Sequence, residues 1–499
     1  MTLPSDTGSE MRVAGGLALE KRALVIAAES LIACDVTFEA ITAYVKPNLA
    51  RVFQVAGWAW QGRAVVQRRL GERVPVDFDT LPVNETLAAL AQAEALAGRP
   101  VYLASSGDGL LASGLMRRFP FVKGMIADDS LQESRQLAIS GAKPGAKSDA
   151  TMSDAIMSNA LARRFPEGFD YIGGANADLG VGRRTGSEVD AGPPRRGIRL
   201  AAPRLSQWRG LVKSLRLHQW TKNLLVFAPF ILGGELDEAG AWLATAVAFL
   251  ALGLVASSTY LVNDILDVAD DRRHWSKRRR PIASGLLPVS MAALCAAAGL
   301  TAGLALAFAV SRDALQVMLV YTALTLAYSL AIKRLPLVDG LALATLFTLR
   351  LGLGVAATAV PPSAWLFVFS MFIFASLSFA KRYTELDRAI KTAGAKISGR
   401  GYRAEDVPLV LAVGVAAGLG AVIILILYII EDAFLRSFYG ATQWLWGFPL
   451  LVFLLICRIW LVTVRGEMND DPVKFMIADT HSQVVLGLLA TCFAFAWLA

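Results

Sequence analysis

The stretch LVASSTYLVNDILDVADDRRHWSKRRRPIASG, residues 254–285, decides the fold. It begins inside an apolar segment long enough to cross a bilayer and ends in a dense run of acids and bases. Asp264, Asp267 and Asp271 fall at positions i, i+3 and i+7, so they share one face of a helix. Hard cations such as Mg²⁺ or Mn²⁺ bind carboxylate oxygens and share them with substrate phosphates. We therefore predict a metal–diphosphate site on these three aspartates, with Asn263 adding a neutral oxygen.

Basic residues follow the acids directly. We expect Lys277 and Arg280 to neutralise the charge of a bound diphosphate, because a cation cluster beside a carboxylate cluster suits a metal–diphosphate complex. The alternative is a solvated acidic helix end that the arginines merely neutralise. Charges at the end of a membrane helix are costly, which favours the functional interpretation.

The second part of the chain is typical of a membrane protein. Hydrophobic residues make up 55% of the sequence, and the mean hydropathy is +0.49. We predict an all-α membrane domain over residues 208–499. Its nine transmembrane helices are expected at about 220–234, 241–263, 287–310, 314–332, 338–360, 363–380, 407–430, 442–463 and 482–499.

Charge predicts the orientation of these helices. The loops after the second, sixth and eighth predicted helices are rich in Lys and Arg, whereas the alternate loops are acidic or nearly uncharged. Such an excess marks the cytoplasmic side. The N-terminus lacks the apolar core of a cleaved signal, so we expect the first domain and the active site to face the cytoplasm of a bacterial inner membrane.

The first 185 residues have a different character. Short apolar runs at 24–28, 101–104 and 171–174 alternate with amphipathic helical stretches, which predicts a soluble α/β domain with a mostly parallel sheet. Residues 186–207 are rich in Gly, Pro and Arg and are expected to be a linker. The four cysteines are widely scattered and indicate no metal or redox site.

The acidic motif also carries a family resemblance. NDxxDxxxD, followed by a basic stretch and RPxxSG, resembles the first signature of the UbiA superfamily of intramembrane prenyltransferases. The resemblance covers about residues 208–499. It implies nine helices around a cavity that is accessible from the lipid.

The loop after the sixth predicted helix distinguishes branches of that superfamily. Members that prenylate aromatic acceptors have a second aspartate-rich motif there, and this chain lacks it. The stretches Lys381–Leu386 and Arg400–Tyr402 resemble instead the decaprenyl-phosphate phosphoribosyltransferase branch. So do Leu215–Pro229, near the first predicted helix, and Arg465–Asp479, in the last cytoplasmic loop.

That resemblance implies transfer of 5-phosphoribosyl from phosphoribosyl diphosphate (PRPP) to a polyprenyl phosphate of the decaprenyl-phosphate type. The expected catalytic residues are the three aspartates with Lys381 and Glu385, where Lys381 and Arg382 receive a phosphate and Glu385 a ribose hydroxyl or second metal. Further substrate-binding residues are expected near the cytoplasmic helix ends: Gln219, Lys222, Asn223, Tyr328, Lys333 and Tyr383.

Two other function classes stay open. One is transfer of a prenyl group from a prenyl diphosphate to an aromatic acceptor, which would use the same fold and metal. The other is a membrane transporter, for which we find no convincing internal repeat. Arg350, inside an apolar segment, should face a cavity or pair with an acid such as Asp339. No nucleic-acid partner is expected, and a homo-oligomer is left open.

The three short strands of the first domain resemble the core of haloacid-dehalogenase-like (HAD) phosphohydrolases. That family needs an aspartate nucleophile after its first strand, where this chain has only Glu29. Ser105 and Lys147 match later motifs. Asp178 matches one metal ligand, but Gly174 stands where the other acid is expected. We therefore predict a catalytically degenerate HAD-like domain that serves assembly, substrate delivery or regulation.

Overall fold

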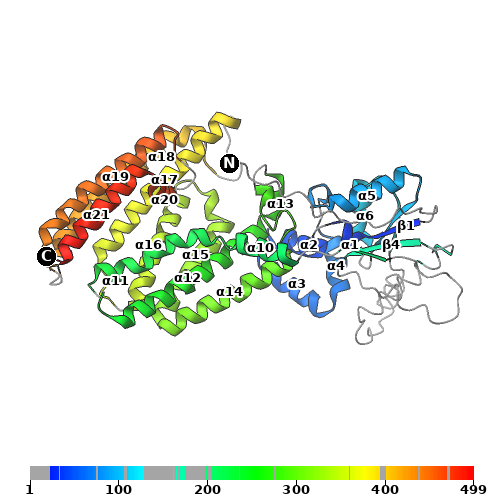
Figure 1. Cartoon of the computed structure of the whole chain (residues 1–499), viewed down its shortest axis with the longest axis horizontal. Coiled ribbons are helices and arrows are strands. Elements are labelled where there is room, and N and C mark those ends of the chain that lie inside the picture. Colours follow the sequence, from blue (N-terminus) through cyan, green and yellow to red (C-terminus); the bar gives the residue numbers. More distant parts are fainter. Residues whose placement is uncertain are drawn as a thin grey trace, which may run out of the picture. The chain divides into compact units, whose positions relative to one another are not determined.

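The structure is a computed structural model that forms two compact units. Unit 1 comprises Met1–Leu211 and Asp264–Met291, and unit 2 comprises Val212–Asn263 and Ala292–Ala499. Figure 1 shows the chain coloured from its N-terminus to its C-terminus. The described residues are 23–32, 34–74, 77–105, 109–127, 161, 164–166, 169–174, 197–200, 204–234, 236–274, 277–358, 360–393, 401–435, 439–468 and 472–498.

Unit 1 is built on a five-stranded parallel sheet with the order β3-β2-β1-β4-β5. Alternate residues of β1 pack into different cores, Leu24 and Ile26 into one and Ala23 and Val25 into another, so the strand is buried on both faces. The strands are β1 (Ala23–Ala27), β2 (Val101–Ser105), β3 (Val122–Ala127), β4 (Phe169–Gly174) and β5 (Gly197–Leu200). The predicted α/β class of this part is confirmed.

Two findings refine the prediction for this unit. β5 pairs with β4 in parallel, although it lies inside the segment 186–207 that we predicted to be a linker. Among the described residues of that segment, Gly197–Leu200 extend the sheet, and the Gly- and Pro-rich composition around them hides this short strand pattern. Lys147 and Asp178, assigned above to HAD-like motifs, lie outside the described residues.

Short helices complete unit 1. Asp35 caps α2 by accepting a hydrogen bond from the Thr37 amide at 2.9 Å, and Asn84 caps α5 by accepting one from Leu87 at 3.2 Å. The helices are α1 (Ala28–Leu31), α2 (Val36–Val45), α3 (Arg51–Trp60), α4 (Arg63–Gly71), η1 (Phe78–Thr80), α5 (Glu85–Leu96), α6 (Gly109–Arg118), α13 (Val268–Arg273) and η3 (Lys277–Arg279). A separate small core that includes Tyr44, Trp58 and Leu70 joins α2, α3 and α4.

Unit 2 is helical. In the described residues, eight helical segments are long and apolar enough to cross a membrane: Ala239–Leu266, Val289–Val310, Arg312–Leu330, Val338–Thr358, Ala364–Lys391, Ala404–Glu431, Thr442–Val464 and Thr480–Trp497. The α-helices of these segments are α12 (Ala239–Leu266), α14 (Val289–Val310), α15 (Arg312–Leu330), α16 (Val338–Thr358), α17 (Ala364–Ala393), α18 (Val407–Glu431), α19 (Gly447–Val464) and α21 (Thr480–Leu498). The predicted multi-spanning helical domain is confirmed.

The first of the nine predicted spans differs. Residues 220–234 form the end of a 3-10 helix, η2 (Leu217–Phe227), and the short α11 (Ala228–Leu232), and they are not among the eight segments described above. Pro229 at the start of α11 has no amide hydrogen to continue the preceding turn. The remaining small elements are α10 (Arg204–Ser214), η4 (Ile332–Arg334), η5 (Ala404–Asp406), η6 (Ala433–Leu435), η7 (Thr442–Trp446) and α20 (Pro472–Ala478).

Glycines allow close helix packing in unit 2. A Cβ on Gly354 of α16 would lie 2.1 Å from the Val226 carbonyl oxygen of η2, and one on Gly414 of α18 would lie 2.3 Å from the Trp460 ring of α19. Small residues at such crossings let helices approach in lipid, where packing replaces the hydrophobic effect.

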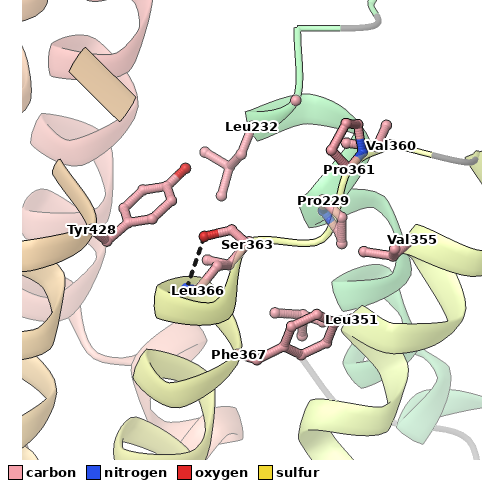
Figure 2. Close-up of a pocket in the computed structure, with 11 residues that line it drawn as sticks. Pro229, Leu232, Leu351, Val355, Val360, Pro361, Ser363, Leu366, Phe367 and Tyr428 are labelled. Carbon is pink, nitrogen blue, oxygen red and sulfur yellow. Dashed lines mark hydrogen bonds between the residues drawn. The ribbon is translucent and has the colours of Figure 1, made fainter. Parts of the chain in front are cut away.

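Figure 2 shows a small cavity in this bundle, lined by residues of α11, α16, α17 and α18 with the loop before α17. Its volume is about 10 Å³, and Ser363 beside it accepts a hydrogen bond from the Leu366 amide at 3.2 Å. A space of that size holds at most about one water molecule. It is a packing defect lined by mostly apolar side chains, and it cannot hold a diphosphate.

Candidate functional site

The acidic motif forms a bent helix end in unit 1. α12 ends at Leu266, Asp267 occupies the N-cap position of α13, and the Asp271 amide donates to the Asp267 carbonyl at 2.8 Å. Asp264 and Asp271 converge on one nitrogen of Arg280: its Nη1 lies 2.9 Å from Asp264 Oδ1 and 2.7 Å from Asp271 Oδ2. Two of the three predicted carboxylates and one predicted cation are therefore brought together.

Burial makes this cluster costly without a cation. The side chains of Asp264 and Asp271 are 3% and 4% exposed, against 23% for Asp267. Burial raises the pKa of Asp271 above its ordinary value, and Arg280 opposes that rise. Within the described residues, no group of three acidic, His or Cys side chains is arranged so that it could hold a metal ion. The positive charge between the two buried carboxylates comes from Arg280.

The α/β domain contacts the same loop through α2 and the residue after it. Lys46 Nζ lies 2.6 Å from Asp270 Oδ2 and 3.7 Å from Asp267 Oδ1. Arg272, next to Asp271, pairs with Glu39 of α2 through two hydrogen bonds of 3.1 and 2.6 Å. Lys46 and Glu39 thus hold the acidic loop from both sides of Asp271.

These ion pairs differ in burial. Arg272 and Glu39 have side chains only 5% and 6% exposed, whereas Arg273 and Asp77, 2.7 Å apart, are 61% and 42% exposed. A bidentate buried pair is much more sensitive to loss of one partner than an exposed pair. Glu39 is therefore the main anchor of the loop. The sequence analysis missed Glu39 and Lys46, because neither lies in a recognisable motif.

A second charged cluster lies on α17 in unit 2. Arg382 is 1% exposed, with Nε 2.5 Å from Asp339 Oδ2 and Nη1 2.5 Å from Glu385 Oε2. Its Nη2 donates to the Tyr328 hydroxyl at 2.8 Å, and Tyr402 donates to Asp339 at 2.6 Å. Three of the predicted site residues, Tyr328, Arg382 and Glu385, are therefore in one hydrogen-bonded network. Asp339 and Tyr402 complete it from α16 and the loop before α18.

We expect Arg382→Met to destabilise the membrane domain. The substitution leaves the buried Asp339 and the partly buried Glu385 without their shared cation, which costs about 3–5 kcal/mol for a buried pair. Thermal unfolding in detergent measures the loss. Lys391→Met on the same helix is the matched control, since Lys391 is 66% exposed and pairs with Asp387. Equal unfolding temperatures for the two variants would contradict the assignment.

A third polar group surrounds Arg350 of α16. This buried arginine donates to Asn223 Oδ1 at 3.3 Å, to the Leu346 carbonyl at 2.6 Å and to the Tyr321 hydroxyl at 3.2 Å. Asp339, one of the alternatives given above for Arg350, is contacted by Arg382. Asn223 is 2% exposed, and its Nδ2 has no hydrogen-bond partner among the residues that the structure describes. A buried amide in this state is suited to donate to a ligand oxygen.

The other predicted residues lie close to these groups in the chain. Gln219 contacts His218 at 3.0 Å, and Tyr383 packs edge-on against Trp460. Lys277, at the start of η3, is exposed. Four other predicted residues are partly exposed: Lys222, Asn263, Lys333 and Lys381. The roles assigned to these residues stay predictions.

Comparisons with known proteins identify a family and several similar proteins. The sequence profile of the UbiA prenyltransferase family matches residues 225–497. The decaprenyl-phosphate phosphoribosyltransferase of Mycobacterium tuberculosis is 32% identical over 295 residues, which cover 58% of this chain and 92% of that enzyme. A solved UbiA homolog from Archaeoglobus fulgidus, bound to DMAPP and Mg²⁺, is 16% identical with a TM-score of 0.46, covering 58% of this chain and 98% of that one.

One relative matches more than the membrane domain. The uncharacterized protein y4nM of Sinorhizobium fredii is 33% identical over 456 residues, which cover 89% of this chain and 84% of that protein. A match of that extent includes most of the residues before the first membrane span. The similarity to that protein therefore extends over both units of this chain.

Proposed function

This chain belongs to the UbiA prenyltransferase family and is a membrane transferase, and on that premise we propose that it moves a 5-phosphoribosyl group from phosphoribosyl diphosphate to a polyprenyl phosphate. The observation that carries the proposal is the composition of the polar end of α17. That helix presents Lys381 and Arg382 with Glu385 and Asp387, and it has no DxxxD motif where an aromatic prenyltransferase has a second aspartate cluster. The similarity to the mycobacterial phosphoribosyltransferase supports the same donor and acceptor.

The reaction is a substitution at ribose C1. An oxygen of the lipid phosphate forms the new bond to C1, and the bond from C1 to the diphosphate oxygen breaks with its electron pair leaving on diphosphate. The attacking phosphate is already ionised at neutral pH, so no strong general base is required. Both substrates are polyanions, and the main task of the protein is to place them together and balance their charge.

The acidic cluster fits a divalent cation. Mg²⁺ usually takes only one or two carboxylates and completes its shell with water and substrate phosphates. Asp264 and Asp271 already converge on a single point, where Arg280 Nη1 now lies. We assign the metal to these two residues with Asp267 and Asn263, and the cation would stabilise the charge of the leaving diphosphate. Arg280 and Lys277 would pair with the diphosphate oxygens.

Further substrate contacts are proposed within unit 2. Lys381 would bind a substrate phosphate. It follows the buried Ala380 on α17, and its side chain is partly exposed and so accessible to a ligand. Arg382 contacts two acids and Tyr328, so we assign it the task of orienting Glu385 and Tyr328 toward the donor. Asn223 Nδ2, with Lys222 and Gln219 nearby in η2, would donate to donor oxygens.

We expect the α/β domain to lack phosphatase activity. Burial, with the charge of Glu39, raises the pKa of the Cys34 thiol to about 12, so this residue is no nucleophile at neutral pH. No aspartate occurs from Leu24 to Ala33, where the HAD nucleophile is expected. The full-length protein should release no phosphate from p-nitrophenyl phosphate or PRPP in the absence of lipid acceptor. Magnesium-dependent release above that of an empty-membrane control would overturn the degenerate assignment.

The assay for the proposed function uses purified full-length protein in lipid nanodiscs. Radiolabelled PRPP, decaprenyl phosphate and Mg²⁺ should yield a labelled, organic-extractable lipid together with one equivalent of diphosphate. Chelation by EDTA should stop the reaction, and added Mg²⁺ or Mn²⁺ should restore it.

The same assay distinguishes the competing reaction. Parallel tubes receive a prenyl diphosphate with 4-hydroxybenzoate as aromatic acceptor in place of PRPP and lipid phosphate. Prenylation of that acceptor, without transfer of label from PRPP, would replace the proposal with the aromatic prenyltransferase alternative.

A further inference from the structure

α3 of the α/β domain has large apolar side chains exposed on its surface. Val55 and Trp58 are buried against the domain, whereas Phe53 and Trp60 are 79% and 94% exposed. An exposed Trp and Phe on one short helix are unusual for a surface in water, and such apolar patches commonly mark a binding surface. The question is which partner covers them.

The charges around α3 indicate what kind of partner covers these aromatic side chains. Residues 46–71 contain no acid and five cations, namely Lys46, Arg51, Arg63, Arg68 and Arg69. Arg51 stacks on the Tyr44 ring at 4.9 Å, and together with Arg73 it lines a surface hollow of about 430 Å³. Exposed aromatics within a basic segment are the composition of segments that lie on anionic membranes.

The ion pairs of the acidic loop tie the residue before α3 to the segment that follows an apolar helix. Lys46 binds Asp270, which lies four residues after Leu266, where the membrane-spanning α12 ends. Four residues of helix span about 6 Å. α3 begins five residues after Lys46, so few residues separate its first turn from the residue that binds the loop after α12.

We propose that α3 lies in the interface of the membrane that the chain spans, with Phe53 and Trp60 among the lipid acyl carbons near the head groups. Arg51 and Arg73 would face anionic phospholipid head groups, and Trp favours this region because its ring is apolar and its N–H is polar. The membrane surface is a better occupant than a second copy of the chain, since two copies would bring two acid-free basic segments together. This surface anchor would support the same loop that Glu39 and Lys46 hold.

Photo-cross-linking of the full-length protein tests the proposal. The photoreactive residue p-benzoyl-phenylalanine replaces Trp60, and in a matched control it replaces Leu96, which is 82% exposed at the end of α5. Both proteins are placed in nanodiscs of phosphatidylglycerol and phosphatidylcholine, irradiated, digested and analysed by mass spectrometry. We expect the peptide around position 60 to gain the mass of one phospholipid and the peptide around position 96 to gain none.

The other outcomes overturn the proposal. A cross-linked dimer at position 60 assigns the face to a second copy, and no adduct above the position 96 level leaves it in water. The charge contribution has its own measurement: adduct yield at position 60 should fall when phosphatidylglycerol is omitted. An unchanged yield would reject the role of the arginines. None of these results depends on the transferase assay.

Discussion

Asp264→Asn is expected to lower phosphoribosyl transfer by about 100-fold or more while the protein stays folded. The substitution keeps the size of the side chain and a hydrogen-bond acceptor for Arg280, but it removes the negative charge that a divalent cation needs. Losing a single group that stabilises transition-state charge commonly costs a factor of this size. Initial rates with labelled PRPP, together with the unfolding temperature in detergent, measure the two effects separately.

Asp270→Asn in the same loop is the matched control. Asp270 is 67% exposed and pairs with Lys46 rather than with Arg280, so its variant should lose less than about fivefold. The expected pattern includes a higher Mg²⁺ concentration for half-maximal rate in Asp264→Asn than in Asp270→Asn. Equal rates and equal metal requirements in the two variants would remove the metal role from Asp264.

Glu39→Gln is expected to loosen the acidic loop, although Glu39 lies 233 residues before its partner Arg272. The change leaves a buried guanidinium without its carboxylate, which costs about 3–5 kcal/mol. Hydrogen exchange should therefore speed up by about 100-fold or more in the amides of α2 and α13, since each 1.4 kcal/mol changes an opening equilibrium tenfold. We also expect weaker Mg²⁺ activation, because Arg272 follows Asp271 directly.

Two further variants distinguish a specific positioning role of the Glu39–Arg272 ion pair from a general loss of stability. Combining Glu39→Leu with Arg272→Met removes both charges and should recover most of the lost protection, because no buried charge is then left unpaired. If metal activation stays weak in this double variant, the ion pair orients the loop specifically. Asp77→Asn breaks the exposed pair with Arg273 and should change neither readout. Equal exchange rates in Glu39→Gln and Asp77→Asn would contradict the anchoring role.

Much of the architecture could be predicted because it depends on local patterns. Runs of about 20 apolar residues predict spans, and eight of the nine predicted positions coincide with such helices. The first position differs because the segment around Pro229 has the composition of a span but forms a 3-10 helix followed by a five-residue α-helix. β5 was missed because four residues within a Gly- and Pro-rich segment carry too little pattern.

Three features of the candidate site could be predicted from the sequence. They are the aspartate spacing, the basic run after it and the absence of a second acidic cluster after residue 381. These features identify the chemistry. The pitch of an α-helix sets the distance between aspartates on one face, so their spacing in the sequence is enough to predict it. The partners of the charges could not be read in this way. Arg382 takes Asp339 and leaves Arg350 to Asn223, and Glu39 reaches Arg272, because the path of the chain through the fold chooses among many acids and bases. In low-dielectric surroundings those choices determine which charges are balanced and which are left for a substrate.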